Sequence, residues 1–549
     1  MHLLGEVQLV VLLLVATLAL AAIARRLLIP YPILLVLGGL VLGGIPGLPA
    51  ARIEPDLVFL VVLPPVLWAA AYFTSLRDFL ANLRPITLLA LGLVTATTAG
   101  VALVARAIVP DMPWAVAIAL GAIVSPPDAV AATTIARQLR IPRRVVTILE
   151  GESLVNDASA LVLYRTAVAA AVTGSFSMGA AIGDFGRTVV VGLVVGLAIG
   201  WIAGRALALT DDSLIETAAT LVAPYAAWTV AEQLHASGVL ACVAGGLLLR
   251  RQYSRVVQPA ARMEARAVWD QLVFLLNALV FILIGLQLRV LREEVPAGGF
   301  GRVLLLATAV SAAVMLLRVA WVFPATWLPR ALSARVRARD PMPSWRRVFL
   351  VAFTGMRGIV SLAAALALPL TIAGGAPFPY RAEIVLTTFG VILSTLVLQG
   401  LSLAPLIRWL GLEDDDALER EELLARRQAA AAALAHLEAI GGAAWVLAPE
   451  HERLRVRYAQ RVAGLADDGA EAAECSAQRA DAYRRLRRET LDAERFAVVA
   501  LRDQGHVSDE VLHRLEHELD VEALRVGVGD ARPVDPRLPA AGAGLPASR

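Results

Sequence analysis

Long apolar runs are the feature that most constrains the fold of this 549-residue chain. Runs of about 18 or more residues recur from Val7 to Leu410, and each is long enough to cross roughly 30 Å of hydrocarbon as a helix. Hydrophobic residues make up 58% of the chain, charged residues 18%, and the mean hydropathy is +0.68. These features exclude an ordinary soluble protein and predict an all-α polytopic membrane protein.

The apolar pattern predicts thirteen transmembrane helices. They fall near residues 7–24, 28–46, 56–76, 85–108, 113–136, 142–173, 183–209, 213–234, 237–249, 267–288, 301–328, 346–371 and 383–410. Arginine is concentrated in alternate loops, for example between Arg330 and Arg347, and the positive-inside rule makes these loops cytoplasmic. Because the number of spans is odd, the N-terminus is expected outside and the C-terminus in the cytoplasm.

The composition changes sharply after Gly411 to a mixture of Ala, Glu and Arg with helical periodicity. We therefore predict a transmembrane domain over residues 1–412 and a cytoplasmic helical tail over 413–549. Further helices of the tail are expected near 449–464, 470–503 and 508–526, before a disordered end from Gly527 that is rich in Pro, Gly and Ala.

The charge and cysteine content exclude other classes of protein. The net charge is only +3 and the basic residues are all Arg, which implies no nucleic-acid partner. Cys242 lies in an apolar span and Cys475 in the tail, so neither a disulfide framework nor a metal site is expected. His513 and His517 lie four residues apart, but without an acidic ligand pattern they are interpreted as part of a solvated helix face. No cofactor and no resident metal ion are expected.

Two consecutive prolines interrupt the fifth predicted span, GAIVSPPDAVAATTI. Pro126 and Pro127 remove backbone donors and clash with the preceding turn, so the helix is expected to break near Asp128. Broken helices are tolerated at bilayer depth where half-helix ends line a polar cavity, as in ion-coupled transporters. The competing interpretation is a kink that Asp128 merely caps. An ion site is preferred because an acid in the bilayer costs about 2.5–3.5 kcal/mol.

The sixth span, ILEGESLVNDASALVLY, places oxygen ligands on one helix face. Ser153, Asn156 and Asp157 stand at i, i+3 and i+4. Carboxylate, hydroxyl and carbonyl oxygens hold alkali cations, and a buried carboxylate also takes up a proton, so one side chain can serve both ions. Glu150 and Glu152 flank the same turn. A structural ion pair with an arginine is the alternative role for both, and it is preferred for Glu152.

The twelfth span, FTGMRGIVSLAAALALP, carries Arg357 between Gly355 and Gly358. The glycines permit unwinding or close backbone approach. Because an intramembrane arginine is rarely without an acidic partner, a pair with Glu152 is predicted, with a substrate anion as the weaker alternative. This span and the fifth are seven apart, so the two interrupted helices are expected in matching positions of two inverted repeats, at the binding site.

Other small and polar residues in the spans carry less information. Gly38 to Gly44 is interpreted as a small-residue face for helix packing. A set of polar residues in the eighth and tenth spans could either line a vestibule or cap helix ends and form ion pairs. These residues are Glu216, Glu232, Asp270, Gln271 and Asn277.

Four motifs, in this order, resemble one family of transporters: GAIVSPPDAVAA, EGESLVNDASALV, FLLNALVFILIGLQL and GMRGIVSL. They look like the bacterial sodium/proton exchanger family, in the electroneutral branch of the monovalent cation/proton antiporters. The segments YPILLVLGGLVLGGIPGLP and HVSDEVLHRLEHELDVEALR extend the resemblance over nearly the whole chain. The resemblance implies thirteen helices divided between a dimerisation domain and a moving core domain, two inverted repeats, and crossed unwound helices at the site. It also implies a homodimer with an elevator-like motion.

The same resemblance implies roles for individual residues. Asp157 matches the ion- and proton-binding carboxylate, Asn156 the residue before it, Ser153 a neighbouring ligand, and Asp128 the acid at the first helix break. An Asn followed by Asp is associated with electroneutral exchange, whereas electrogenic relatives carry two acids there.

The resemblance further implies that Glu152 and Arg357 form the structural ion pair of the core. Two positions depart from the pattern of many relatives. This chain has Pro127 where they carry Thr, which removes a hydroxyl but leaves the Pro127 carbonyl as a ligand, and it has Ala69 where they carry Asp or Glu.

Together these observations predict a proton-coupled Na⁺ antiporter of the bacterial inner membrane. Na⁺ and H⁺ would compete for Asp157 while the site alternates its exposure, with one cation exchanged for one proton. Potassium is the close alternative as main cation, with Li⁺ as a further candidate, since hard-oxygen ligands alone do not set cavity size. A membrane sensor would need an effector motif in the tail, and an intramembrane hydrolase a Ser/His or metal-bound His arrangement; neither pattern accompanies the acids, so no enzyme is expected.

Overall fold

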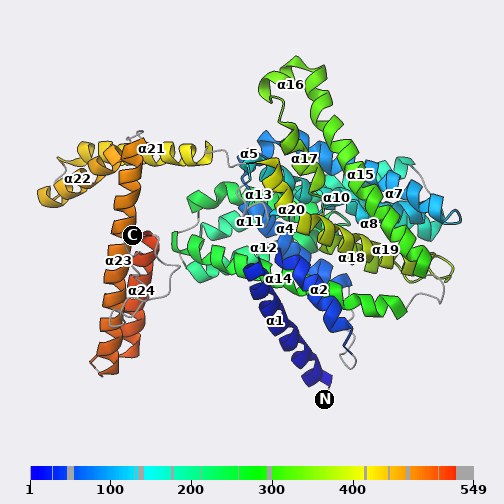
Figure 1. The fold of residues 1–549 in the computed structure, drawn as a ribbon, viewed down its shortest axis with the longest axis horizontal. Helices are drawn as coiled ribbons and strands as arrows, with labels where there is room; N and C mark the ends of the chain where they lie inside the picture. The colour runs from blue at the N-terminus through cyan, green and yellow to red at the C-terminus, as the bar shows by residue number, and fades with distance from the viewer. Residues whose placement is uncertain are drawn as a thin grey trace, which may run out of the picture. The chain divides into compact units, whose positions relative to one another are not determined.

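The computed structural model describes residues 2–27, 29–45, 55–128, 130, 132–133, 141–174, 178–210, 212–256, 259–293, 300–412, 417–442, 446–464, 470–504 and 506–526. The chain forms two compact units, residues 1–414 and 415–549. Within the described residues both units are helical, apart from an isolated bridge between Thr371 and Pro377 (Figure 1). The all-α prediction is therefore confirmed.

The first half of unit 1 contains the elements that lead to the first helix break and the long helix after it. They are α1 (His2–Leu27), α2 (Tyr31–Gly43), α3 (Pro55–Leu57), η1 (Val58–Val62), α4 (Leu63–Phe73), α5 (Leu76–Ala81), α6 (Leu83–Thr87), η2 (Leu88–Leu93), α7 (Val94–Ile108), α8 (Trp114–Val124) and α10 (Arg143–Thr173).

The second half of unit 1 contains several long helices and the second break. Its elements are α11 (Met178–Leu207), α12 (Ser213–Gln233), α13 (Gly238–Val256), α14 (Pro259–Glu293), α15 (Phe300–Leu332), α16 (Ala334–Arg339), α17 (Trp345–Phe353), α18 (Ile359–Leu366), α19 (Arg381–Ser394), η3 (Thr395–Gln399) and α20 (Gly400–Leu410).

Seven helical segments among the described residues are long and apolar enough to cross a membrane. They are Pro55–Phe73, Leu83–Ile108, Ile182–Leu207, Ser213–Gln233, Ala261–Gln287, Phe300–Leu332 and Arg381–Leu410. The helices α2 and α8 are apolar but shorter. Membrane spans are thus confirmed, and the total of thirteen stays a prediction.

Both predicted interruptions are present. Helix α8 ends at Val124 and does not continue over residues 125–128, as expected where Pro126 and Pro127 remove two backbone donors. Helix α17 ends at Phe353, and α18 begins at Ile359. The intervening residues 354–358 are not helical, so the twelfth span is divided at its glycines.

Small residues allow two helices of unit 1 to touch along their backbones. Helix α2 packs against α14. A Cβ atom on Gly39 would lie 2.2 Å from the carbonyl oxygen of Ile282, and one on Gly285 would lie 2.2 Å from that of Val36. These contacts confirm the packing role predicted for the glycines of α2.

The described part of unit 2 contains four helices: α21 (Ala417–Ile440), α22 (Ala448–Gly464), α23 (Ala470–Asp503) and α24 (Asp509–Val526). The last two pack through Leu491, Leu519 and Ala523. The helices coincide with the stretches predicted from periodicity. The predicted boundary after residue 412 and the predicted disordered end from Gly527 fall on segments outside the described residues.

Candidate functional site

The two helix breaks, residues 125–128 and 354–358, lie against each other inside unit 1. We call this contact the crossing. The backbone N–H of Asp128 donates a hydrogen bond to the carbonyl oxygen of Met356 at 2.7 Å. In the other direction, Nε of Arg357 donates to the carbonyl oxygen of Val124 at 2.9 Å. Backbone groups released by each interruption are therefore satisfied by the other, which is the condition for keeping broken helices away from water.

Asp128 lies at the N-terminal end of α18 and beside Val130. Its Oδ1 accepts from the backbone N–H of Val130 at 2.8 Å, and a further backbone hydrogen bond joins the carboxylate to Ile359, the first residue of α18. Helix N-termini carry partial positive charge, which favours a carboxylate at this position. Gly358 is required here, because a Cβ atom on it would lie 1.8 Å from Oδ2 of Asp128.

Arg357 has the opposite place in the crossing. Its side chain is buried, and besides Val124 its guanidinium donates to the carbonyl oxygen of Gly355. Val124 ends α8, and Gly355 follows the end of α17. A cation thus lies at the negative ends of α8 and α17, whereas an anion lies at the positive end of α18.

The long helix α10 brings the second acid to the crossing. Asp157 is 7% exposed and, together with Ser153 one turn earlier, lines a cavity of about 330 Å³. Asp128 and Ser361 of α18 line the same cavity. Ser361 is buried, and within the described part of the chain its Oγ has no hydrogen-bond partner. Two carboxylates and two hydroxyls from three chain segments therefore share one cavity.

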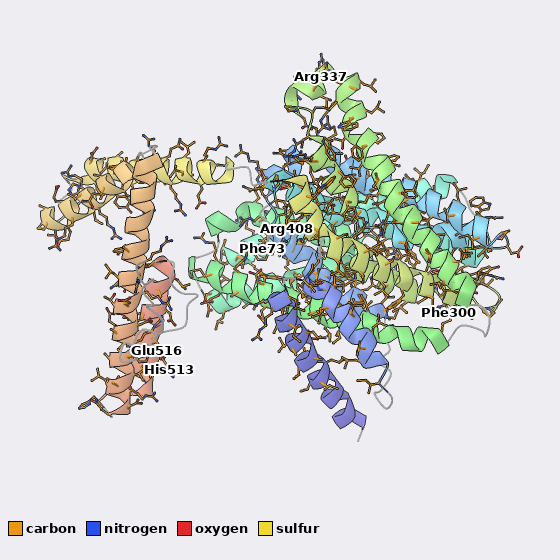
Figure 2. The ribbon with its side chains drawn as sticks, in the orientation of Figure 1. Phe73, Phe300, Arg337, Arg408, His513 and Glu516 are labelled. Atoms are coloured by element: carbon orange, nitrogen blue, oxygen red, sulfur yellow. The ribbon has the colours of Figure 1, made fainter. Side chains whose placement is uncertain are left out.

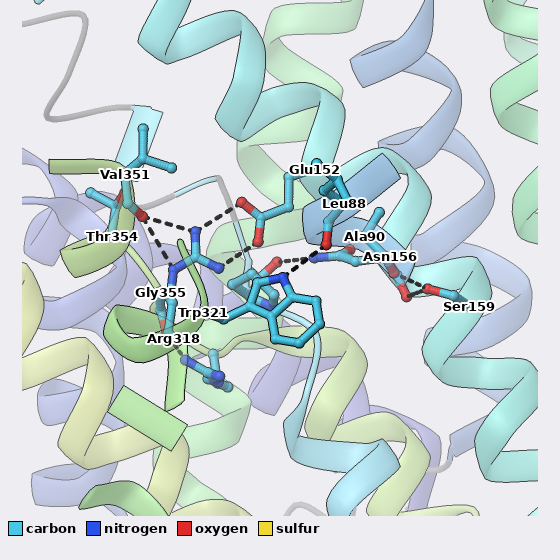
Figure 3. Close-up of polar contacts among 12 residues, drawn as sticks. Leu88, Ala90, Glu152, Asn156, Ser159, Arg318, Trp321, Val351, Thr354 and Gly355 are labelled. Carbon is cyan, nitrogen blue, oxygen red and sulfur yellow. Dashed lines mark hydrogen bonds and ion pairs between the residues drawn. The ribbon is translucent and has the colours of Figure 1, made fainter. Parts of the chain in front are cut away.

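Asn156 lies beside the first break, and it is not among the described residues that line the cavity. Its Nδ2 donates to the carbonyl oxygen of Pro127 at 3.2 Å. Ser159 fixes this turn of α10 against η2, because its Oγ donates to the carbonyl oxygens of Asn156 and Ala90 at 2.9 and 2.6 Å (Figure 3). The carbonyl that was expected as a cation ligand is thus hydrogen-bonded to Asn156.

The structure corrects the predicted partner of Glu152. Its carboxylate forms a two-pronged ion pair with Arg318 of α15, in which Nη2 lies 2.8 Å from Oε2 and Nη1 donates to Oε1 (Figure 3). Both side chains are 1% exposed. Arg318 also donates to the carbonyl oxygen of Val351 at the end of α17. The guanidinium of Arg357 instead donates hydrogen bonds to the carbonyl oxygens of Val124 and Gly355 at the two breaks.

The sequence contained a signal for Arg318 that the motif analysis did not use. The residue interrupts the apolar run MLLRVAWVF, so the rule that intramembrane charges need partners applies to it as much as to Arg357. Ser361 lies within the GMRGIVSL motif but was not identified as a ligand. Neither residue could be placed without knowing which helices pack together.

The polar residues that were expected either to line a vestibule or to cap and pair fall into two groups in the structure. Asp270 and Asn277 line the cavity, and Asp270 pairs with Arg266 at 3.1 Å at exposed positions. Glu232 instead forms a surface ion pair with Arg165 at 2.7 Å. Glu150 also lines the cavity.

The arrangement suits a hard monovalent cation and a proton. The oxygens of Asp128, Asp157, Ser153 and Ser361 are the ligand types that such cations take. Among the described residues, no group of three or more His, Cys, Asp or Glu could hold a metal ion.

Comparison with known proteins gives the family. A sequence profile described as "Sodium/hydrogen exchanger, transmembrane" matches residues 11–409. A Mycobacterium tuberculosis protein named an uncharacterized Na⁺/H⁺ exchanger is 36% identical over 500 residues, covering 90% of this chain and 91% of its own length. A Bacillus pumilus protein named a sodium, potassium, lithium and rubidium/H⁺ antiporter is 34% identical over 419 residues, covering 73% of this chain and 61% of its own length.

The fold is also similar to a solved antiporter structure. The sodium/proton antiporter MjNhaP1 from Methanocaldococcus jannaschii at pH 8 superposes with a TM-score of 0.59 at 20% identity, covering 75% of this chain and 99% of that one. The profile match spans both helix breaks, α10 and α15, which together hold the crossing and its cavity. The chain therefore belongs to the sodium/hydrogen exchanger family.

Proposed function

We propose that this protein is a secondary antiporter that exchanges Na⁺ for H⁺ across the bacterial inner membrane. The observation that carries the proposal is the cavity at the crossing, which brings Asp157 and Asp128 together with two hydroxyls. A cation needs oxygen ligands and a counter-charge there, and a buried carboxylate can exchange that cation for a proton.

Asp157 is the carboxylate that exchanges ions in this proposal. Asp128 accepts hydrogen bonds from the backbone N–H groups of Val130 and Ile359, and in this proposal it keeps one protonation state throughout the cycle. Asn156 cannot titrate, and its amide is engaged by Pro127. One Na⁺ then replaces one H⁺ on Asp157, and the cycle moves no net charge.

Alternating access follows if the crossing and α10 move together against the rest of unit 1. The interactions between Asp128 and Met356, and between Arg357 and Val124, tie the two interrupted helices into one body. We further propose that the protein works as a homodimer, as the family resemblance implies. The arginine distribution predicts that its C-terminal unit lies in the cytoplasm.

Potassium is a second candidate cation. The name of the Bacillus pumilus relative, which is 34% identical to this chain, includes potassium and rubidium as well as sodium and lithium. Hard-oxygen ligands bind all of these cations, and discrimination depends on cavity size and ligand flexibility.

Transport in proteoliposomes tests the proposal. Vesicles with an acidic interior and an internal pH dye should show dequenching when Na⁺ is added outside, and the same assay with K⁺ and Li⁺ ranks the cations. Protein-free vesicles are the control. If none of the three cations moves protons, the exchange function is wrong.

A clamped membrane potential tests the stoichiometry. A potential contributes roughly 2.3 kcal/mol per charge per 100 mV, so an electroneutral cycle should run at the same initial rate at either polarity set with valinomycin. Control vesicles without Na⁺ report any transport of K⁺ by the protein itself. A several-fold dependence on polarity would show that Asp128 or another acid titrates together with Asp157.

A further inference from the structure

A second cavity lies at one end of unit 1, outside the ion site. It encloses about 290 Å³ between α6 and η2, the start of α10, the end of α15 and the segment that leads into α17. Four arginines line it: Arg84, Arg144, Arg330 and Arg347. Among the described residues that line this cavity, none is acidic.

The arginines share one carboxylate that lies beside the cavity. Asp340 accepts hydrogen bonds from Arg84 and Arg144 at 2.7 Å and from Arg330 at 2.6 Å. Burial acts to raise the pKa of Asp340, but the hydrogen bonds and charges of Arg144 and Arg330 outweigh it and hold that pKa below its ordinary value. Asp340 therefore stays ionised at neutral pH, and three guanidinium charges face a single negative charge.

Two of these arginines keep donors for an additional anion. Arg84 contacts Asp340 through Nη2, and Arg144 uses Nη2 for Asp340 and Nε for Asn82. The side chains of Arg84 and Arg144 are 32% and 43% exposed. A phosphate can therefore approach their remaining N–H groups, and guanidinium groups bind phosphate through paired hydrogen bonds.

Apart from Thr326, the rest of the cavity wall is apolar, and the cavity lies where two candidate membrane spans begin and end. Leu88, Leu89 and Val322 line it. The candidate span Leu83–Ile108 begins beside the cavity, and the span Phe300–Leu332 ends beside it. Trp327 and Trp345 are 38% and 49% exposed near these ends, which is typical of residues at headgroup level.

The surface next to the cavity is also basic. Helix α16, with the sequence ARVRAR, extends beyond the neighbouring helices of unit 1, and Arg337 lies at its far end (Figures 1 and 2). Lys and Arg close to a bilayer are attracted to anionic lipids. An anionic headgroup is therefore favoured both by the cavity and by its surroundings.

We propose that this cavity binds the phosphate of an anionic phospholipid. Arg84 and Arg144 hold the phosphate in competition with Asp340, and the first carbons of an acyl chain lie against Leu88 and Val322. The apolar wall favours a lipid over free phosphate, because inorganic phosphate has nothing to place on it.

Lipid binding to the purified full-length protein tests the proposal. Native mass spectrometry measures apparent dissociation constants for phosphatidylglycerol, for phosphatidylcholine of the same chain length, and for inorganic phosphate. The double variant R84Q/R144Q should bind phosphatidylglycerol about tenfold more weakly or worse, with little change for phosphatidylcholine. The matched control R335Q/R337Q removes two charges from α16 outside the cavity and should change the affinity by less than about threefold.

A third variant separates binding from a purely structural role of the cluster. Asp340→Asn removes the competing carboxylate and should strengthen phosphatidylglycerol binding, even where it lowers the melting temperature. Equal weakening by both double variants, or weaker binding by Asp340→Asn, would overturn the site. Inorganic phosphate that displaces phosphatidylglycerol from the wild type at equal concentration would overturn the assignment to lipid. If R84Q/R144Q does not fold, R84Q alone takes its place.

Discussion

Three buried carboxylates of unit 1 differ in what surrounds them. Glu152 faces a guanidinium within a two-pronged pair. Asp128 lines the cavity and accepts hydrogen bonds from the backbone N–H groups of Val130 and Ile359. Asp157 also lines the cavity and is the acid to which the proposed mechanism assigns ion exchange.

The role of Asp157 gives the first prediction. Asp157→Asn keeps the shape of the side chain but removes its charge and its proton, so cation-dependent proton flux should fall to the level of empty vesicles. Asp111→Asn, at an exposed loop position, is the matched control and should transport normally. Flux measured with the internal pH dye decides the result. Near-normal flux in a well-folded Asp157→Asn protein would remove this residue from the mechanism.

The ion pair of Glu152 gives the second prediction. Arg318→Ala leaves Glu152 buried without its partner, which should cost about 3–5 kcal/mol of stability. Arg165→Ala breaks an exposed pair with Glu232 and should cost less than about 1 kcal/mol. Thermal unfolding in detergent compares the two variants. If the two variants have the same melting temperature, the buried ion pair contributes no more to stability than the surface pair.

At the scale of elements, the crossing depends on how closely the two breaks approach. Gly358 immediately precedes α18, and Asp128 follows the two prolines of the first break. The carboxylate passes so near that no Cβ atom fits at position 358. The half-helices can therefore share Asp128 only while this residue is glycine.

The close approach gives the third prediction. Gly358→Ala should displace Asp128 from Val130 and Ile359, with a loss of about 1–3 kcal/mol and a reduced rate of exchange. Gly301→Ala is the matched control, because a Cβ atom there meets no atom within 4 Å. Melting temperature and dye-measured flux should both separate the two variants. A Gly358→Ala protein with wild-type stability and flux would contradict the observed crossing.

At the scale of the whole molecule, the proposed ion site and the C-terminal unit belong to different stretches of the chain. The family match ends at residue 409, and unit 2 begins at residue 415. Unit 2 has its own small apolar cluster around Leu491 and Leu519. Every residue of the proposed ion site lies in unit 1.

This separation gives the fourth prediction. Removal of residues 415–549 should leave cation-dependent proton flux in place while shifting its dependence on pH or cation concentration. Flux is measured across a pH series and compared with the full-length chain at equal amounts of inserted protein. A truncated protein that elutes as one folded species but moves no protons would show that unit 2 is required for transport.

Much of the fold and part of the site follow from the sequence alone. The apolar runs predicted the membrane spans, because crossing hydrocarbon demands a minimum length of apolar helix. Pro126 and Pro127 predicted the first break, and Gly355 and Gly358 the second, because these residues act on their own backbone. Spacing also placed Ser153 and Asp157 on one face of α10, since helical periodicity is local.

Contacts between helices distant in the chain were decided only by the tertiary structure. The charge rule predicted that Glu152 has a basic partner, but the packing of α15 against α17 brought Arg318 to it and left Arg357 to the carbonyls of the breaks. Ser361 likewise joined the cavity only through the crossing. Periodicity and propensity act over a few residues, whereas an ion pair forms wherever packing brings opposite charges together, and the packing of thirteen predicted spans has many solutions that one sequence pattern fits equally well.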